Sequence, residues 1–260
     1  MLFGDYHTHT RFSHGKGTVM GNCQRAFELG LKEIAITDHS FGHLGHPIRK
    51  RRMQAFLQQI RAARLAFIDL RVIAGLECNL LDGKGTIDFD EGLFEAMDKE
   101  SVALGAVEHG FIVLGYHKFI KPTGVKEFFG FNLPMFFGGA RVGASRKAKT
   151  TDAFIKAFER FPVSILSHPC VGVGVDMKAL SEAAAHFGVY LEINGRRIAY
   201  SREDIDIILA SGAQFIINSD AHKSENVGVV DKPLAFIKEM GIDLARVANW
   251  GKSPEFRGGR

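Results

Sequence analysis

Histidines and carboxylates recur at short spacings in this 260-residue sequence. The segment DYHTHTRFSHG, next to the N-terminus, contains His7, His9 and His14. In an extended segment alternate side chains share a face, so His7 and His9 can both point at one ion, as can Asp220 and His222. Imidazole combined with carboxylate is a ligand set for zinc, manganese or iron. These pairs therefore predict a metal centre.

The predicted metal ligands each lie at or just after the end of an apolar run that reads as a strand. They are His7, His9, His14, His39, Glu77, His117, His168, Asp220 and His222. Nine ligands exceed the needs of one tetrahedral or octahedral ion, so the predicted cofactor is two or three divalent ions, Zn, Mn or Fe. Glu77 is the predicted bridge between two ions, and Asp38 is predicted to orient an imidazole from outside the ligand shell. The remaining histidines do not fit this pattern and are expected to be structural or solvent-facing: His43, His46, His109 and His186.

The elements that must position these side chains are seven short, buried, β-branched-rich runs, which are typical of parallel strands. They span residues 2–7, 33–37, 71–77, 111–117, 163–168, 189–194 and 214–220. Apolar residues at helical spacing lie between them, over 53–67, 154–161 and 177–187, and Ser201 with Asp204 predicts a capping box. This alternation predicts an α/β fold with a parallel sheet. A closed barrel is favoured over an open sheet, because the reactive residues end nearly every strand and no Gly-x-Gly-x-x-Gly follows the first one.

Length and composition fit one domain over residues 1–260, with 46% hydrophobic residues. The N-terminus has no signal-peptide pattern and no apolar run is long enough to span a bilayer, so we expect a cytoplasmic protein without a membrane partner. Cys23, Cys78 and Cys170 are far apart and form no CxxC, which disfavours disulfides and a cysteine zinc site.

The formal net charge of +4 is unevenly distributed. RKRR at 49–52 is one basic segment, and residues 118–149 carry seven Lys or Arg against Glu127 alone, so the rest of the chain is net negative. This pattern favours a local anion site over a protein-wide nucleic-acid surface, with two solvated loops as the alternative. Residues 118–149 are expected to be a basic, Phe-rich loop insertion, irregular around FFGFNLPMFFGG at 128–139. It would form a lid, a partner surface such as a homo-oligomer contact, or a satellite core.

The motifs HTHTRFSHG, ITDHS, ILSHP and NSDAH, with GLE ending at Glu77 and GYH ending at His117, resemble the signature of the polymerase and histidinol phosphatase (PHP) superfamily. The resemblance covers nearly the whole chain and implies a distorted (β/α)7 TIM-like barrel with a trinuclear site. The chain departs from the family by extra residues between Met97 and Phe111 and by its long 118–149 segment. The implied ligands of the three metals are His7, His9, Glu77 and Asp220; Glu77, His117 and His168; and His14, His39 and His222.

The resemblance implies a metal-dependent phosphoesterase, which would hydrolyse a small phosphomonoester with a metal-activated hydroxide. The predicted catalytic residues are Asp220, His222 and Arg196. Candidate phosphate-binding residues are Arg11, Arg196, Arg197, Arg141 and Lys147, with Arg146 and Lys149 in the same long segment. The alternatives are a phosphodiesterase or exonuclease acting on nucleotide or oligonucleotide ends, which the net negative body disfavours, and a non-catalytic metal-binding accessory domain.

Overall fold

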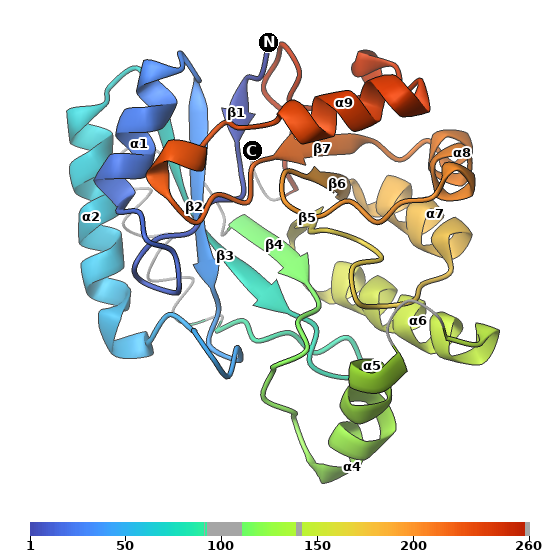
Figure 1. Cartoon of the computed structure of the whole chain (residues 1–260). Coiled ribbons are helices and arrows are strands. Elements are labelled where there is room, and N and C mark those ends of the chain that lie inside the picture. The colour runs from blue at the N-terminus through green and yellow to red at the C-terminus, as the bar shows by residue number, and fades with distance from the viewer. Residues whose placement is uncertain (91, 93–110, 139–141, 258–260) are drawn as a thin grey trace.

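A computed structural model describes residues 1–90, 92, 111–138 and 142–257. Its seven strands form one parallel sheet in the order β1-β2-β3-β4-β5-β6-β7, which curls into a nearly closed barrel (Figure 1). The predicted α/β barrel is therefore confirmed. The strands are β1 Gly4–Asp5, β2 Glu33–His39, β3 Arg71–Asn79, β4 Phe111–Gly115, β5 Val163–Leu166, β6 Tyr190–Asn194 and β7 Phe215–Asn218.

The seam between β1 and β7 distorts the barrel, because side chains replace most of the backbone ladder there. The Tyr6 backbone N–H donates to the side-chain oxygen of Asn218 (2.9 Å), and the Ser219 backbone N–H donates to Asp5 (3.1 Å). The only strand-like pairing recorded across this seam among the described residues is the single bridge between Thr8 and Ala221. Side-chain bonding explains why β1 has two residues where the sequence predicted a longer strand.

Helices cover the outside of the sheet, with α1 and α2 on one side of the strands and α6, α7 and α8 on the other (Figure 1). No helix among the described residues is long and apolar enough to cross a membrane. The helices are α1 Val19–Glu28, α2 Met53–Ala66, α4 Val125–Glu127, α5 Leu133–Gly138, α6 Ala144–Arg160, α7 Met177–Phe187, α8 Arg202–Ser211 and α9 Asp231–Met240. A π-helical turn spans Phe128–Asn132, and 3-10 turns span Lys50–Arg52, Ser224–Asn226 and Leu244–Arg246.

The barrel interior has an apolar layer below the functional face. Alternation along β3 places Ile73, Gly75 and Glu77 on the interior side, and Ile73 joins a small buried cluster with Phe111. A Cβ on Gly75 would lie 2.8 Å from the Phe111 ring and 2.8 Å from its carbonyl oxygen, so only glycine fits there. The same alternation carries Glu77 above this layer, toward the C-terminal strand ends.

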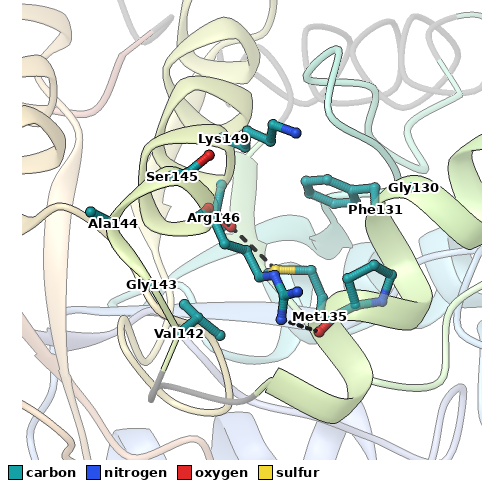
Figure 2. A pocket seen from close by; sticks show the side chains of 11 residues that line it. Gly130, Phe131, Met135, Val142, Gly143, Ala144, Ser145, Arg146 and Lys149 are labelled. Carbon is teal, nitrogen blue, oxygen red and sulfur yellow. Dashed lines mark hydrogen bonds between the residues drawn. The ribbon is translucent and has the colours of Figure 1, made fainter.

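The segment 128–139 is helical where it is described, so the expectation of an irregular loop was wrong. The π-helical turn and α5 place Phe131 and Met135 four residues apart on one face, and both are buried in the main core. Among α5, α6 and the preceding turn lies a cavity of about 570 Å³, which Arg146 and Lys149 help to line (Figure 2). None of the nine predicted ligands lines this cavity. Arg141 and the expected insertion between Met97 and Phe111 lie outside the described residues.

The predicted capping box opens α8. The Ser201 hydroxyl accepts from the Asp204 backbone N–H (3.1 Å), and the Asp204 carboxylate accepts from the Ser201 backbone N–H (2.8 Å).

We expect Ser201→Ala to lower the free energy of unfolding by about 1 kcal/mol, because one helix-end N–H loses its partner. Urea denaturation measures this change, and an unchanged midpoint would contradict it. Metal content should stay the same, since the cap does not contact the predicted ligands.

Candidate metal centre

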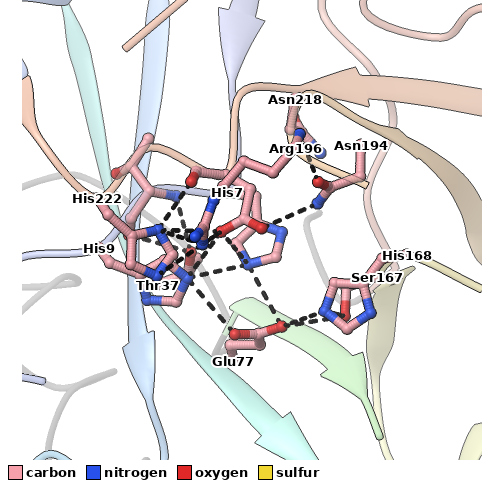
Figure 3. Close-up of polar contacts among 12 residues, drawn as sticks. His7, His9, Thr37, Glu77, Ser167, His168, Asn194, Arg196, Asn218 and His222 are labelled. Carbon is pink, nitrogen blue, oxygen red and sulfur yellow. Dashed lines mark hydrogen bonds and ion pairs between the residues drawn. The ribbon is translucent and has the colours of Figure 1, made fainter. Parts of the chain in front are cut away.

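All nine predicted ligands converge at the C-terminal ends of the strands. Figure 3 shows His7, His9, Glu77, His168 and His222 of this group. Residues more than two hundred positions apart are neighbours there: the His14 and His222 ring centroids lie 4.2 Å apart, and those of His9 and His222 lie 4.5 Å apart. On the other side of the site, the His117 and His168 rings lie 5.2 Å apart. The convergence follows from the parallel barrel, which brings every strand end to one face.

Glu77 lies at the centre of the imidazole cluster and is buried. Its carboxylate oxygens lie 2.8 Å from His39 Nδ1 and 3.1 Å from His168 Nε2. Three further ring nitrogens lie 3.4–3.6 Å away, those of His7, His9 and His117. Burial raises the pKa of the Glu77 carboxyl, but the surrounding imidazoles outweigh this effect and hold its pKa well below the usual range. Glu77 is therefore an anionic centre shared by five imidazoles.

The donor atoms fit divalent metal ions. Three groups each bring their ligand atoms within 4.8 Å of one another: His7, His9 and Asp220; His39, Glu77 and His117; and His9, His39 and His222. The ring nitrogens of His14 and His222 approach to 2.6 Å, and those of His7 and His9 to 3.2 Å. Nδ1 of His9 and Nδ1 of His14 are buried without a hydrogen bond. Buried nitrogens that face one another without protein partners are the donor set that zinc, manganese or iron satisfies.

Hydrogen bonds behind the imidazoles select the tautomer that binds metal. His7 Nδ1 lies 2.8 Å from a Glu192 carboxylate oxygen, and His117 Nδ1 lies 2.6 Å from the side-chain oxygen of Asn79. An oxygen can only accept, so the proton of each neutral ring lies on Nδ1 and the Nε2 lone pair is free for a metal. Neither Glu192 nor Asn79 was among the residues predicted from the sequence. The signal that could have found them is strand alternation: Asn79 lies two residues after Glu77 on β3, and Glu192 is a carboxylate in the middle of the apolar strand β6.

Asp38 does not have its predicted partner. Its carboxylate accepts from the backbone and hydroxyl of Thr10 (2.8 and 2.5 Å) and from the backbone and hydroxyl of Ser13. Because side chains alternate along β2, Asp38 points away from the side that His39 faces. It therefore fixes the turn between His9 and His14 instead of orienting an imidazole. Burial raises the pKa of this carboxyl against the opposing effect of its hydrogen bonds.

Two of the predicted ligands adopt a strained backbone. His168 (φ 30°) and Asp220 (φ 52°) have positive φ, as does Cys170 (φ 67°). Such conformations cost a non-glycine residue about 1–3 kcal/mol and persist where the surrounding structure imposes them. Asp220 lies two residues after the end of β7, where the chain must turn to bring both Asp220 and His222 to the site.

Of the predicted phosphate-binding residues, Arg196 lies beside the cluster. Its Nη1 is 3.0 Å from both ring nitrogens of His222 and 3.8 Å from Asp220 Oδ1. Arg196 also lines a cavity of about 530 Å³ together with His14, Asp220 and His222, where Lys16 and Lys223 add positive charge. Neither lysine was predicted from the sequence, although Lys223 directly follows His222 and Lys16 lies two residues after His14.

The other candidate cations lie elsewhere. Arg197 is exposed and does not line the Arg196 cavity. Arg11 lines a separate cavity of about 260 Å³ with Arg52, one residue of the basic run at 49–52. Lys147 is half-buried on α6 and lines neither cavity. The two basic segments therefore do not combine with Arg196 into one described anion site.

The histidines outside the predicted pattern have different positions. His186 is exposed on α7 and His109 lies outside the described residues. His46 is exposed, with its ring centroid 5.4 Å from that of His14. His43 is half-buried, and its ring stacks on His39 at 4.5 Å. His43 was expected to be structural or solvent-facing, and its Nδ1 does accept the backbone N–H groups of Gly45 and His46, while its ring lies beside the cluster because the chain after β2 folds back there.

The sequence of this chain is similar to those of known proteins. Residues 5–186 match the model of the PHP domain. A protein of Thermoanaerobacter sp. (strain X514) named "Probable phosphatase" is 25% identical over 97% of this chain and 93% of its own length. One of Shewanella loihica with the same name is 26% identical over 94% of this chain and 88% of its own.

A solved structure shares the fold. The histidinol phosphate phosphatase of Lactococcus lactis, crystallised with zinc, L-histidinol and phosphate, aligns with a TM-score of 0.60 at 15% identity. The alignment covers 99% of this chain and 97% of that one. The family model spans more than half of the chain, including seven of the nine residues at the cluster. The chain therefore belongs to the PHP domain family of metal-dependent phosphoesterases.

Proposed function

We propose that this protein hydrolyses small phosphomonoesters at a cluster of two or three divalent metal ions. The observation that carries the proposal is the convergence of seven histidines and two carboxylates beside a cavity lined by Arg196. The relatives named as phosphatases and the phosphate bound in the Lactococcus protein support the same chemistry. The three cysteines are free thiols, which supports a reducing compartment such as the cytoplasm.

The metals would be held as the family resemblance implies. One set is His7, His9, Glu77 and Asp220, a second is Glu77, His117 and His168, and a third is His14, His39 and His222. Divalent ions lower the pKa of bound water toward about 7 and neutralise charge on phosphoryl oxygens. Glu77 would be shared by the first two sets, because its oxygens lie 3.4 Å from His7 and 3.5 Å from His9 of the first set and 3.1 Å from His168 of the second. Zinc, manganese and iron all suit this mixture of nitrogen and oxygen donors.

The chain's own cations would bind the phosphoryl group. The Arg196 guanidinium presents several donors in one plane, which matches two phosphoryl oxygens at once. Asn194 sets its position, since the side-chain oxygen of Asn194 accepts from the backbone N–H groups of Arg196 (2.8 Å) and Arg197 (3.0 Å). Asp220 and His222 contact Arg196, so the proposed catalytic residues form one connected group.

Arg196→Ala is expected to lower kcat/KM for a phosphomonoester by about a hundredfold, because a charge-assisted donor to the phosphoryl group is lost. Arg197→Ala is the matched control: it follows in sequence, is exposed, and should change kcat/KM by less than about twofold. Steady-state kinetics of the two variants measure the difference. Equal effects would contradict the assignment of phosphate binding to Arg196.

The function is tested by loading the protein with zinc, manganese or iron and measuring hydrolysis of p-nitrophenyl phosphate and its diester analogue. Turnover of the monoester that His168→Ala abolishes and His186→Ala preserves would support the proposal. His186 is the matched control because it is an exposed histidine on α7. Faster turnover of the diester would replace the proposal with a phosphodiesterase. Equal background rates in all three proteins would favour a non-catalytic metal-binding domain.

A further inference from the structure

His43 packs against the metal centre without being one of its predicted ligands. Its ring centroid lies 4.5 Å from that of His39, with 27° between the ring planes, and 5.5 Å from that of His117. The groups of residues whose donor atoms suit a metal do not include it within the described chain. The position of His43 therefore suits a role other than metal ligation.

The loop that carries His43 is held in place from two sides. The Gly42 backbone N–H donates to the Asp88 carboxylate (2.8 Å), and the Gly42 carbonyl accepts from the Lys121 backbone N–H (2.7 Å). The following Leu44 backbone N–H donates to the Phe119 carbonyl (2.8 Å), and His43 itself forms an antiparallel bridge with Ile120. The imidazole is thus fixed over the cluster, as a group that contacts substrate must be.

The tautomer of His43 is opposite to that of His7 and His117. Its Nδ1 accepts the backbone N–H groups of Gly45 and His46, both at 3.2 Å. Two donors facing Nδ1 require a lone pair there, so the ring proton lies on Nε2. At His7 and His117 an oxygen faces Nδ1 and leaves the Nε2 lone pair free. Nε2 of His43 is therefore an N–H donor and has no lone pair to offer a metal.

We infer that His43 donates a hydrogen bond from Nε2–H to an oxygen of the phosphoryl group bound at the metal centre. This inference rests on the proposed function, since it assumes that the cluster binds phosphate esters. Within the described part of the chain no hydrogen bond from this N–H is recorded, and the ring is half-buried beside His39 and His117. A neutral N–H donor beside the metals supplements the cation Arg196, which stands near His222. Because His43 stands beside His39 and His117, the two donors would hold the phosphoryl group from different sides of the cluster.

The first test is the tautomer itself, measured by long-range ¹H–¹⁵N NMR on the zinc-loaded protein labelled with ¹⁵N-histidine. The signal that disappears in His43→Gln should report a protonated Nε2 and an unprotonated Nδ1. A protonated Nδ1 would overturn the inference. This readout does not depend on activity, so it stands apart from the outcome of the substrate screen.

The second test compares His43→Leu with His43→Gln in the zinc-loaded protein. We expect His43→Leu to weaken binding of inorganic phosphate by about tenfold in calorimetry and to lower kcat/KM by about a hundredfold, with metal content unchanged. His43→Gln should recover part of both losses, because its amide nitrogen reaches close to the position of Nε2 and also donates. His186→Leu, an exposed histidine away from the cluster, is the matched control.

Three outcomes would overturn the inference: unchanged phosphate affinity in His43→Leu, equal losses in His43→Leu and His43→Gln, or a loss of metal that accounts for the loss of affinity. If the wild-type protein binds phosphate through His43 but hydrolyses no ester, the proposed function fails and the inferred contact stands. If the wild-type protein hydrolyses esters and His43→Leu is as active as the wild type, the proposed function stands and the inferred contact of His43 fails.

Discussion

Glu77→Gln is expected to lower kcat/KM for a phosphomonoester by at least about a thousandfold and to reduce bound metal, since several kcal/mol of metal-dependent stabilisation would be lost. The substitution keeps the size of the side chain and removes its charge. The Glu77 carboxylate is surrounded by five imidazoles. The amide of glutamine can offer only one oxygen to the metal ions. Metal analysis of the purified variant and steady-state kinetics measure the two effects.

Glu33→Gln is the matched control for this prediction. Glu33 is also buried, but it begins β2 at the opposite end of the barrel, where it accepts hydrogen bonds from Tyr6 (2.8 Å) and Arg71 (3.1 Å). Its substitution should destabilise the fold and leave the metal content unchanged. A Glu77→Gln protein with full metal content and wild-type kcat/KM would contradict the proposed bridge.

Glu192→Gln is expected to weaken metal binding by about 10- to 100-fold, because residues that orient a metal ligand typically have effects of this size. Glu192 is fully buried and its oxygens accept from four donors: His7 Nδ1 (2.8 Å), the His168 backbone N–H (2.9 Å) and the side chains of Asn194 (2.8 Å) and Asn218 (2.9 Å). A glutamine must turn its amide NH₂ toward one of these donors. If it faces His7, the ring proton moves to Nε2, which removes the lone pair meant for the metal.

Metal titration against a competing chelator measures this loss, and kcat/KM should fall with metal occupancy. Tyr200→Phe is the control, because the Tyr200 hydroxyl donates to the backbone carbonyl of Glu192 (3.2 Å) and leaves its carboxylate untouched. That variant should lose stability by about 1 kcal/mol without a change in metal affinity. An unchanged metal dissociation constant in Glu192→Gln would show that Glu192 does not orient His7.

Much of the fold followed from local patterns. The seven strands appear near their predicted positions, and the predicted capping box of Ser201 and Asp204 opens α8. The helical structure of segment 128–139 was not predicted, because its many glycines and phenylalanines hide the one pair of buried apolar residues at helical spacing. Phe131 and Met135 form that pair, and a single pair four residues apart is too brief a signal to stand out in the sequence.

The sequence by itself determined which side chains meet at the metal centre, because residues at the ends of parallel strands must share one face of a barrel. Only the tertiary structure decided how those side chains are held. Glu192 and Asn79 fix imidazole tautomers, Asp38 holds a turn, and His43 reaches the cluster. The physical reason is the distance along the chain over which each feature is set. Strand periodicity is a property of neighbouring residues and can be read from the sequence. These hydrogen bonds and ring contacts join segments far apart in the chain or depend on how a loop folds back.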